Sequence, residues 1–378
     1  MIGGALADEL LNHWICQIAT GKNGPLVDVV KQVHIGKPSL CRSFYPGILR
    51  EQAKCGDKMR LVMVLVAALL LSGCKPKPDP LPDYGKLPAG AFVASARNLE
   101  TRGVLWASES GAGTLFSTDL PSELITASTA TILVHGYNTP AAKVAAYFHG
   151  LLSYLRDDRG YPSPLVLYDW KSTARHWDEV PFEEQQGYIE FLSTTVGERL
   201  GGRIPGLPAD LRWENTQYSS DRVNATTSGA DGLVRLVQQL ARGRREVRIH
   251  ILAHSMGSQV VLDALSRAAD DMVAVTKILL LAPDVDASAL QQEKLARINA
   301  LEALHVFYSR RDEVVATYSR MANLGFPRLG ATGPANVEKL PAYVHVHDVG
   351  DTLGTSNVHG AYITREGAAA LRLDDMLR

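Results

Sequence analysis

The sequence predicts an α/β fold in which a mostly parallel central sheet carries helices on both faces. Three observations point to it: short apolar runs rich in β-branched residues, helical patterns between these runs, and polar residues directly after several of them. Strands that alternate with helices form parallel sheets, because a parallel strand is reached only through a crossover connection. Ligands bind such sheets at the carboxyl ends of the strands. We therefore expect the functional site among the residues that follow the strands.

Six apolar runs are expected to form strands, because each is short and bounded by polar residues, glycine or proline. They are Thr131–His135, Leu165–Tyr168, Val247–Ala253, Lys277–Ala282, Ala303–Tyr308 and Tyr343–His347. Helices are expected between them, over Pro140–Leu155, Gly229–Arg242, the residues directly after Ser255, and Ala287–Asn299. Pro140 is suited to the first turn of a helix, and the second helix has apolar residues at helical spacing.

One segment, residues 173–217, breaks this alternation after the strand that ends near Trp170. It mixes aromatic residues with glycines and prolines. Two interpretations remain open: an insertion that forms a lid or faces the substrate, and an elaboration of the surface without a role in the site.

Composition and charge exclude several classes of function. The chain has 378 residues and a formal net charge of −1, which gives no electrostatic basis for binding nucleic acid. Its four cysteines all lie at or before Cys74. The folded part therefore has no internal disulfide and no thiol cluster for a metal. We expect no metal and no cofactor, and the oligomeric state is left open.

The amino-terminal region is expected to direct the protein to a membrane. Residues 59–73 have a charged start and an apolar run of signal-peptide length, and Leu71-Ser72-Gly73-Cys74 resembles the bacterial lipobox. Cys74 would then carry acyl chains, residues 74–90 would form a proline-rich tether, and residues 91–378 would form the folded domain. Residues 1–58 are interpreted as an unstructured upstream extension. The expected location is the bacterial cell envelope, at the outer membrane facing the periplasm; a short buried helix that ends in cysteine is the alternative.

The residues Ala253-His254-Ser255-Met256-Gly257 have the features of a nucleophile elbow, a tight turn that presents a serine between a strand and a helix. Small residues must flank the serine in such a turn, and Gly257 and Ala253 fill these two positions. Glycine is more usual than alanine at the first. We therefore predict Ser255 as a nucleophile, and we expect His254 to point away from the site.

A serine nucleophile needs a base, and the base needs an acid that orients it. His359 is the predicted base, because it lies in a polar loop between the last strand and the terminal helical pattern. His305, His345 and His347 lie within strands, where a packed or hydrogen-bonded ring is expected. Asp312 is the predicted acid, in the loop after Ala303–Tyr308. Its rivals also follow strands, and they are Asp284, Asp286, Asp348 and Asp351.

An oxyanion needs two backbone N–H donors that point at one position. Met256 follows the nucleophile and would supply one of them. Tyr137, in the sequence His135-Gly136-Tyr137-Asn138 after a strand, is the candidate for the second, with an ordinary turn as the alternative. Trp170 and Asp284, which also follow strands, are candidates for contact with the substrate.

Four stretches read in chain order resemble the α/β-hydrolases, and within them the bacterial family DUF900. They are Leu133–Asn138, Tyr168–Ser172, Ala253–Gly257 and Leu281–Asp286, and Tyr218–Arg222 matches a further family stretch. The chain departs from the family at Lys171, where proline is usual, and at Ser258, where asparagine is common. The resemblance implies a serine hydrolase fold with the triad in the order serine, acid, histidine, and it implies little about the substrate.

Together these features predict a lipid-anchored serine hydrolase of the carboxylesterase type, which cleaves a small acyl ester through an acyl-enzyme on Ser255. Two alternatives stay open. The chain could be an inactive hydrolase fold that serves as a binding or scaffolding lipoprotein, or the same triad could act on amides or thioesters or transfer acyl groups.

Overall fold

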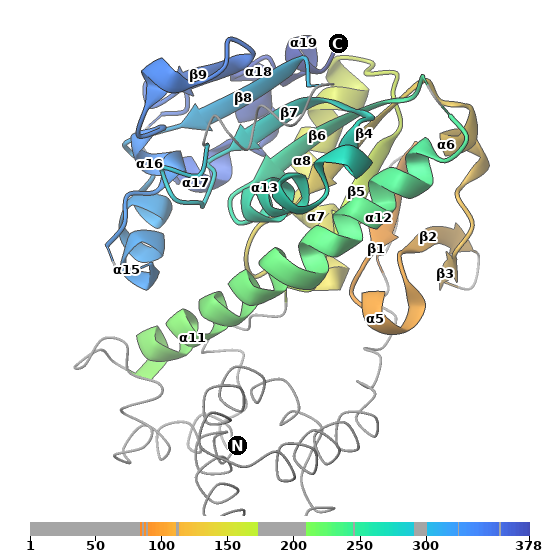
Figure 1. The fold of residues 1–378 in the computed structure, drawn as a ribbon, viewed down its shortest axis with the longest axis horizontal. Coiled ribbons are helices and arrows are strands. Elements are labelled where there is room, and N and C mark those ends of the chain that lie inside the picture. Colours follow the sequence, from red (N-terminus) through yellow and green to blue (C-terminus); the bar gives the residue numbers. More distant parts are fainter. Residues whose placement is uncertain are drawn as a thin grey trace, which may run out of the picture. The chain divides into compact units, whose positions relative to one another are not determined.

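In the computed structural model the described residues form one α/β unit, and they include all six expected strands (Figure 1). The structure describes residues 84, 87, 90–110, 113–172, 209–244, 246–290, 301–323, 325–354 and 357–378. The expected signal peptide, Cys74, residues 1–58, most of the tether and most of the 173–217 segment lie outside these residues. Among the helices of the described part, none is both long enough and apolar enough to cross a membrane.

A nine-stranded sheet forms the centre of the described part, in the order β3-β2-β1-β5-β4-β6-β7-β8-β9. From β1 to β9 all neighbouring strands are parallel, and β2 and β3 add an antiparallel edge. The strands are β1 (Ala91–Ser95), β2 (Leu105–Ser110), β3 (Gly113–Ser117), β4 (Thr129–Val134), β5 (Leu165–Asp169), β6 (Arg248–His254), β7 (Val275–Leu281), β8 (Ala303–Tyr308) and β9 (Val344–Asp348). The predicted fold class is confirmed, and β4 to β9 are the six predicted strands with ends shifted by at most two residues.

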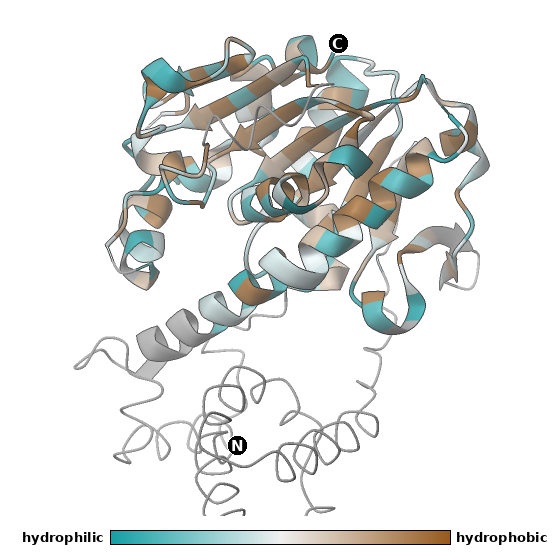
Figure 2. Cartoon of the chain, viewed as in Figure 1, coloured by the Kyte–Doolittle hydropathy of each residue, from teal (hydrophilic) through white to brown (hydrophobic). Residues whose placement is uncertain are grey.

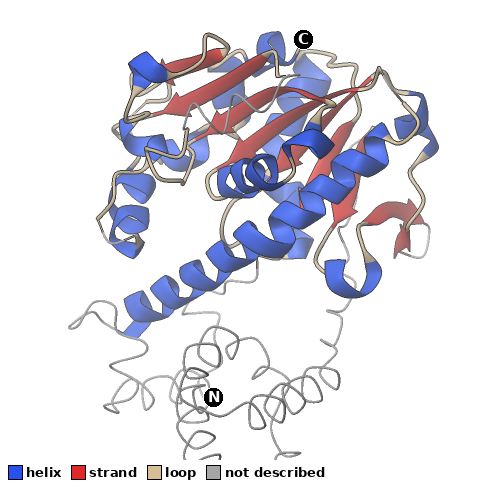
Figure 3. Cartoon of the chain, viewed as in Figure 1, coloured by secondary structure: helices blue, strands red, loops and turns tan. Residues whose placement is uncertain are grey.

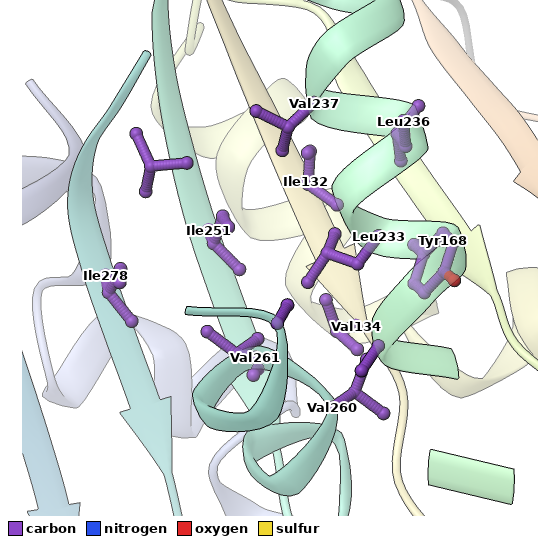
Figure 4. Close-up of a cluster of buried hydrophobic side chains, with 14 of the residues drawn as sticks. Ile132, Val134, Tyr168, Leu233, Leu236, Val237, Ile251, Val260, Val261 and Ile278 are labelled. Atoms are coloured by element: carbon purple, nitrogen blue, oxygen red, sulfur yellow. The ribbon is translucent and has the colours of Figure 1, made fainter. Parts of the chain in front are cut away.

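Helices cover both faces of the sheet, as Figure 3 shows. One face carries α12 (Ala230–Ala241) and α13 (Gly257–Arg267). In Figure 4 their apolar side chains point into a common core with side chains of four strands. The labelled members of this core are Ile132, Val134, Tyr168, Leu233, Leu236, Val237, Ile251, Val260, Val261 and Ile278, and each is fully buried. Burial of this apolar surface is the main stabilisation of the fold.

The opposite face is covered by two groups of short helices. The first group follows β4 and comprises η3 (Ala141–Lys143), α7 (Val144–Tyr147), α8 (His149–Ser153) and η4 (Tyr154–Asp158). The second ends the chain and comprises α17 (Val358–Ala361), α18 (Arg365–Ala370) and α19 (Leu373–Leu377). Leu151 and Leu373 are fully buried from these two groups against Leu167 and Leu279 of the sheet. The central strands are apolar toward both layers, and Figure 2 shows hydrophilic and hydrophobic residues together on the helices that cover them.

The remaining helices lie in the connections. They are α5 (Leu99–Arg102), α6 (Ser122–Thr126), α11 (Ala209–Asn224), η6 (Ala225–Gly229), η7 (Ala269–Met272), η8 (Val314–Ser319), α15 (Arg320–Ala322), α16 (Leu329–Thr332) and η9 (Val337–Lys339). In Figure 1, α11 leads directly through η6 into α12.

The helix expected over Gly229–Arg242 is confirmed as α12, and α11 and η6 lead into it without a break. Two other helix predictions need correction. The helix expected over 140–155 is divided into short pieces, η3, α7, α8 and η4. Residues 287–290 form a turn rather than the start of a helix, and the rest of that expected helix, 291–299, lies outside the described residues. The central strands β4, β5 and β6 were easier to recognise because almost all their residues are buried. A strand that is buried on both faces reads as a near-continuous apolar run.

Candidate active site

Ser255 lies in the turn between β6 and α13, at the carboxyl end of a central strand. Its φ is 55°, in the left-handed region that residues other than glycine seldom adopt. Backbone hydrogen bonds hold it there: its N–H donates to the Leu281 carbonyl at 2.9 Å, and its own carbonyl accepts from Ser258 and Asp284. Strain of this kind costs about 1–3 kcal/mol and persists only where the surroundings fix it. The turn is thus held in the conformation of a nucleophile elbow.

Two glycines let the chain pack closely around this serine. A Cβ on Gly257 would lie 2.6 Å from the carbonyl oxygens of both Val134 and His135, so α13 can approach the end of β4 only with glycine here. A Cβ on Gly136 would lie 2.9 Å from Cβ of Ser255. The loop after β4 and the elbow are therefore in direct contact, with no room for a larger residue at either position.

His359 and Asp312 both reach toward Ser255. Nε2 of His359 lies 3.0 Å from Oγ of Ser255, and Nδ1 of His359 lies 2.8 Å from Oδ2 of Asp312. A carboxylate only accepts hydrogen bonds, so Nδ1 carries the proton and Nε2 is free to accept the serine proton. The predicted acid and base follow the predicted nucleophile by 57 and 104 residues along the chain. The structure brings all three into one hydrogen-bonded row.

Asp312 is fully buried at the start of η8. Its second oxygen accepts from the backbone N–H of Val315 at 3.1 Å, which fixes the carboxylate. The rival acids bind elsewhere. Asp286 accepts from Ser288, and Asp348 accepts from the N–H of Gly350.

The two remaining rivals and the strand histidines also have other contacts. Asp351 is paired with Arg311, and Asp284 with Arg328. His305 and His347 contact each other across β8 and β9, with Nδ1 of the first 3.1 Å from Nε2 of the second. The interpretation of these two rings as hydrogen-bonded strand residues therefore agrees with their contacts.

The two proposed oxyanion donors lie in the expected segments. Met256 precedes the first residue of α13, and the first N–H groups of a helix have no partner within the helix. Tyr137 lies in the loop after β4, one residue after Gly136, which packs against Ser255. At the next position Asn138 has a φ of 54°, and its N–H donates to Asp221 at 3.4 Å. The loop thus folds back sharply beside the nucleophile.

The comparison of the sequence with known families gives one match. Residues 113–369 match the family described as alpha/beta hydrolase of unknown function, DUF900. The chain belongs to this family. It is a hydrolase of the α/β-hydrolase fold.

The chain is similar to several solved structures. A lipase-esterase related protein of Clostridium acetobutylicum is 10% identical, with a TM-score of 0.33, over 67% of this chain and 96% of that one. The catalytic core of acetyl xylan esterase from Trichoderma reesei is 9% identical, with a TM-score of 0.32, over 65% and 97%. An esterase of Pyrococcus furiosus is 13% identical, with a TM-score of 0.34, over 72% and 87%. No curated protein matches the sequence.

Trp170 packs against the first residue of the loop after β4. It is fully buried, its indole N–H donates to the His135 carbonyl at 2.8 Å, and its ring is stacked on the His135 ring with centroids 5.2 Å apart. A fully buried indole with its one donor engaged cannot reach a substrate. We therefore assign Trp170 to the support of the hydrolase site rather than to the contact with substrate that we expected.

Asp169, next to Trp170, anchors the same loop electrostatically. Its carboxylate is fully buried and accepts from Nε of Arg97 at 2.8 Å, while Nη2 of Arg97 donates to the Thr139 carbonyl at 2.8 Å. Burial alone would raise the pKa of Asp169, but the charge of Arg97, the neighbouring His135 ring and the hydrogen bonds from Arg97 lower it to about 2. The carboxylate is therefore ionised at neutral pH.

Asp284 is also a supporting residue. Its carboxylate accepts from Nε of Arg328 at 2.9 Å and from the Tyr218 hydroxyl at 2.7 Å, and Ser319 is a third donor. Arg328 is only 2% exposed, so both charges of the pair are buried. The Asp284 N–H donates to the Ser255 carbonyl. The pair thus fixes the loop beneath the elbow, and its carboxylate is occupied by the protein instead of a ligand.

Sequence reasoning missed several supporting residues, and for some of them no local signal exists. Arg97 precedes the first predicted strand and bonds to residues 72 and 42 positions away. Asp221 accepts from the Ser172 hydroxyl at 2.6 Å and from the loop after β4. The stretch Tyr218–Arg222 had been noted as family-like, and that was the one available indication of its role.

The described residues offer no metal site: no group of three or more histidine, cysteine, aspartate or glutamate side chains among them could hold an ion.

Proposed function

We propose that the protein is a serine hydrolase that cleaves carboxylic esters through an acyl-enzyme on Ser255. The observation that carries this proposal is the position of His359, with Nε2 3.0 Å from Oγ of Ser255 and Nδ1 2.8 Å from Asp312. A base within hydrogen-bond reach of a hydroxyl, itself oriented by a carboxylate, is the requirement for an activated serine.

In the first half-reaction, Oγ of Ser255 attacks the carbonyl carbon while Nε2 of His359 takes the hydroxyl proton. The carbonyl oxygen gains the negative charge, which the N–H groups of Met256 and Tyr137 stabilise. When the tetrahedral intermediate collapses, the bond to the alcohol oxygen breaks and His359 gives its proton to that oxygen. The alcohol leaves, and an ester of Ser255 remains.

The second half-reaction repeats these steps with water. His359 takes a proton from water, the hydroxide attacks the acyl carbon, and the intermediate collapses with the return of the proton to Oγ of Ser255. Asp312 stays ionised and stabilises the imidazolium in both halves. An ester is the favoured substrate because its alcohol leaves more readily than an amine. The leaving group therefore needs less protonation by His359.

A fluorophosphonate probe tests this proposal. The wild-type chain should be labelled at one site, and Ser255→Ala should not be labelled although it melts at a similar temperature. A folded wild-type chain without labelling would overturn the hydrolase proposal and favour the scaffolding alternative. A panel of matched esters, thioesters and amides then separates the reaction classes. Faster cleavage of the amide or thioester than of the ester would overturn the assignment to esters.

We further propose that the hydrolase is anchored to the cell envelope through acyl chains on Cys74. The support is the apolar run that ends in Leu71-Ser72-Gly73-Cys74, followed by a proline-rich segment. In a bacterial host, incorporation of labelled palmitate should be lost in Cys74→Ser and kept in Cys55→Ser. Equal incorporation in both variants would refute the anchor.

A further inference from the structure

His254, the residue before the nucleophile, is buried directly beside the base. Its side chain is nearly inaccessible, and its ring centroid lies 4.8 Å from that of His359. Nε2 of His254 lies 2.7 Å from the backbone carbonyl oxygen of His359, and Nδ1 lies 2.6 Å from the hydroxyl of Tyr147. The ring therefore does not point away from the site, as its place in the sequence suggested, but touches the segment that carries the base.

When His254 is neutral, its contacts determine which ring nitrogen donates a hydrogen bond and which accepts one. A carbonyl oxygen only accepts, so Nε2 must carry the proton and donate it to His359. Nδ1 is then a bare acceptor, and the hydroxyl of Tyr147 must donate to it. The oxygen of Tyr147 in turn accepts from the backbone N–H of Gly136 at 3.1 Å. One continuous row of donors therefore runs from Gly136 to the carbonyl of His359.

Burial keeps both side chains in the required protonation states. It lowers the pKa of His254 to about 3, with the neighbouring His359 as a second cause, so the ring is neutral at neutral pH. Burial also raises the pKa of Tyr147, so its hydroxyl keeps the proton that it donates. Both groups therefore keep these protonation states at neutral pH, which suits a structural link and not a second proton carrier.

The two ends of this row are the two parts of the site that must be held relative to each other. Gly136 lies next to Tyr137, the proposed oxyanion donor, and it packs against Ser255. His359 lies on α17, more than two hundred residues later in the chain. These segments come from different elements, so the Tyr147–His254 pair is a direct polar connection between them.

We propose that Tyr147 and His254 are positioning residues, which hold His359 in register with the oxyanion loop. This inference rests on the proposed serine hydrolase function. Tyr147→Phe removes the hydroxyl and keeps the ring, so the link is cut in the middle. A displacement of about 1 Å at a reacting group costs roughly 100-fold in rate. We expect fluorophosphonate labelling of Tyr147→Phe to be about 10-fold to 100-fold slower than that of wild type.

Tyr161→Phe is the matched control. It also removes a buried hydroxyl, one that contacts Oγ1 of Thr131 at 2.8 Å near the opposite end of β4. We expect it to label within about twofold of wild type, since no reacting group would move. Equal labelling rates for Tyr147→Phe and Tyr161→Phe would overturn the positioning role. A wild-type chain that is not labelled would instead overturn the hydrolase proposal itself.

Two substitutions of His254 test the hydrogen bond from Nε2 of His254 to the His359 carbonyl. The amide nitrogen of His254→Gln can occupy the position of Nε2 and donate to His359, whereas the amide of His254→Asn matches the position of Nδ1. His254→Gln should therefore keep more of the labelling rate than His254→Asn. The reverse order would contradict the proposal.

A measurement on the wild-type chain tests the link even if some of these variants do not fold. In nitrogen NMR of histidine-labelled protein, the ring signal that is lost in His254→Gln should hold its proton on Nε2 and show no titration above pH 5. If this ring carries its proton on Nδ1 or protonates between pH 5 and pH 8, the link is not formed and the proposal fails.

Discussion

Gly257→Ala is the sharpest perturbation of the elbow, because it adds one methyl group at a measured contact. The new Cβ would lie 2.6 Å from the carbonyl oxygens of Val134 and His135. An ordinary carbon–oxygen contact is about 3.3 Å, so each oxygen must retreat by about 0.7 Å. Both oxygens belong to the backbone at the end of β4, where no flexible side chain can give way. Either α13 moves outward or the loop that leads to Tyr137 moves.

Two consequences of different size follow from this movement. Overpacking of a well-packed site costs about 1–3 kcal/mol, so the free energy of unfolding should fall by that amount. A shift of about 0.7 Å between Ser255 and the oxyanion loop should lower reactivity more steeply, on the order of 30-fold to 100-fold. The catalytic loss thus exceeds what the loss of stability alone would produce, because the protein remains folded.

Urea denaturation and the second-order rate of fluorophosphonate labelling measure the two effects separately. Gly350→Ala is the control, since its Cβ would lie 3.3 Å from the hydroxyl of Ser309 and 3.4 Å from the carboxylate of Asp348, both of which are ends of side chains. We expect it to keep a labelling rate near that of wild type. If Gly257→Ala labels as fast as Gly350→Ala, the close contact between α13 and β4 does not position the nucleophile, and the reasoning is refuted.

Three further predictions follow from the buried charges of the site. Asp312→Asn should lower the labelling rate by roughly 10³-fold to 10⁴-fold with little loss of stability, because the amide no longer fixes the His359 tautomer; a loss below tenfold would contradict this role. The pKa of Asp169 is lowered from 3.8 to about 2, so its ionised form should contribute about 2 kcal/mol to the free energy of unfolding. This contribution is present above pH 4 and is lost as the pH falls through 2. In acid denaturation, Asp169→Asn should remove this pH dependence, and an unchanged acid profile would contradict the pairing with Arg97. Arg328→Met should lower the free energy of unfolding by about 3–5 kcal/mol, because it leaves a buried carboxylate unpaired; a loss below about 1 kcal/mol would show that this pair is not required.

The sequence allowed the centre of the sheet to be predicted, because its strands are buried on both faces. Val166 and Leu167 of β5 are both fully buried and belong to different cores, so the strand reads as a continuous apolar run. Strands β1, β2 and β3 were missed, and β2 and β3 form the antiparallel edge of the sheet beyond β1. β2 contains Ser108, Glu109 and Ser110 and lies in the antiparallel edge, so its sequence has no continuous apolar run.

Helix α11 was missed for the same kind of reason. Its sequence, from Ala209 to Asn224, is largely polar, so it has no clear apolar stripe to mark helical periodicity. Residues 209–217 were therefore assigned to an insertion. The helix is recognisable only through its continuation into α12, whose apolar face packs on the sheet.

The candidate reacting groups could be selected from the sequence because each carries a local signal. Ser255 is marked by a turn that requires small residues two positions before and after it, and Asp312 and His359 follow strands whose carboxyl ends lie at one edge of the sheet. The supporting residues carry no such signal. Tyr147 and His254 bond across 107 positions, and the role of each is defined only by the packing that brings them together.

The most direct test of the central claim is to locate the acyl group during turnover. A p-nitrophenyl ester should give a burst of one p-nitrophenolate for each active site, and the chain quenched during the burst should gain the mass of one acyl group. Peptide mapping should place that group on Ser255, and Ser255→Ala should show neither the burst nor the mass. Ester turnover with the acyl group on another residue, or undiminished turnover in Ser255→Ala, would contradict the account.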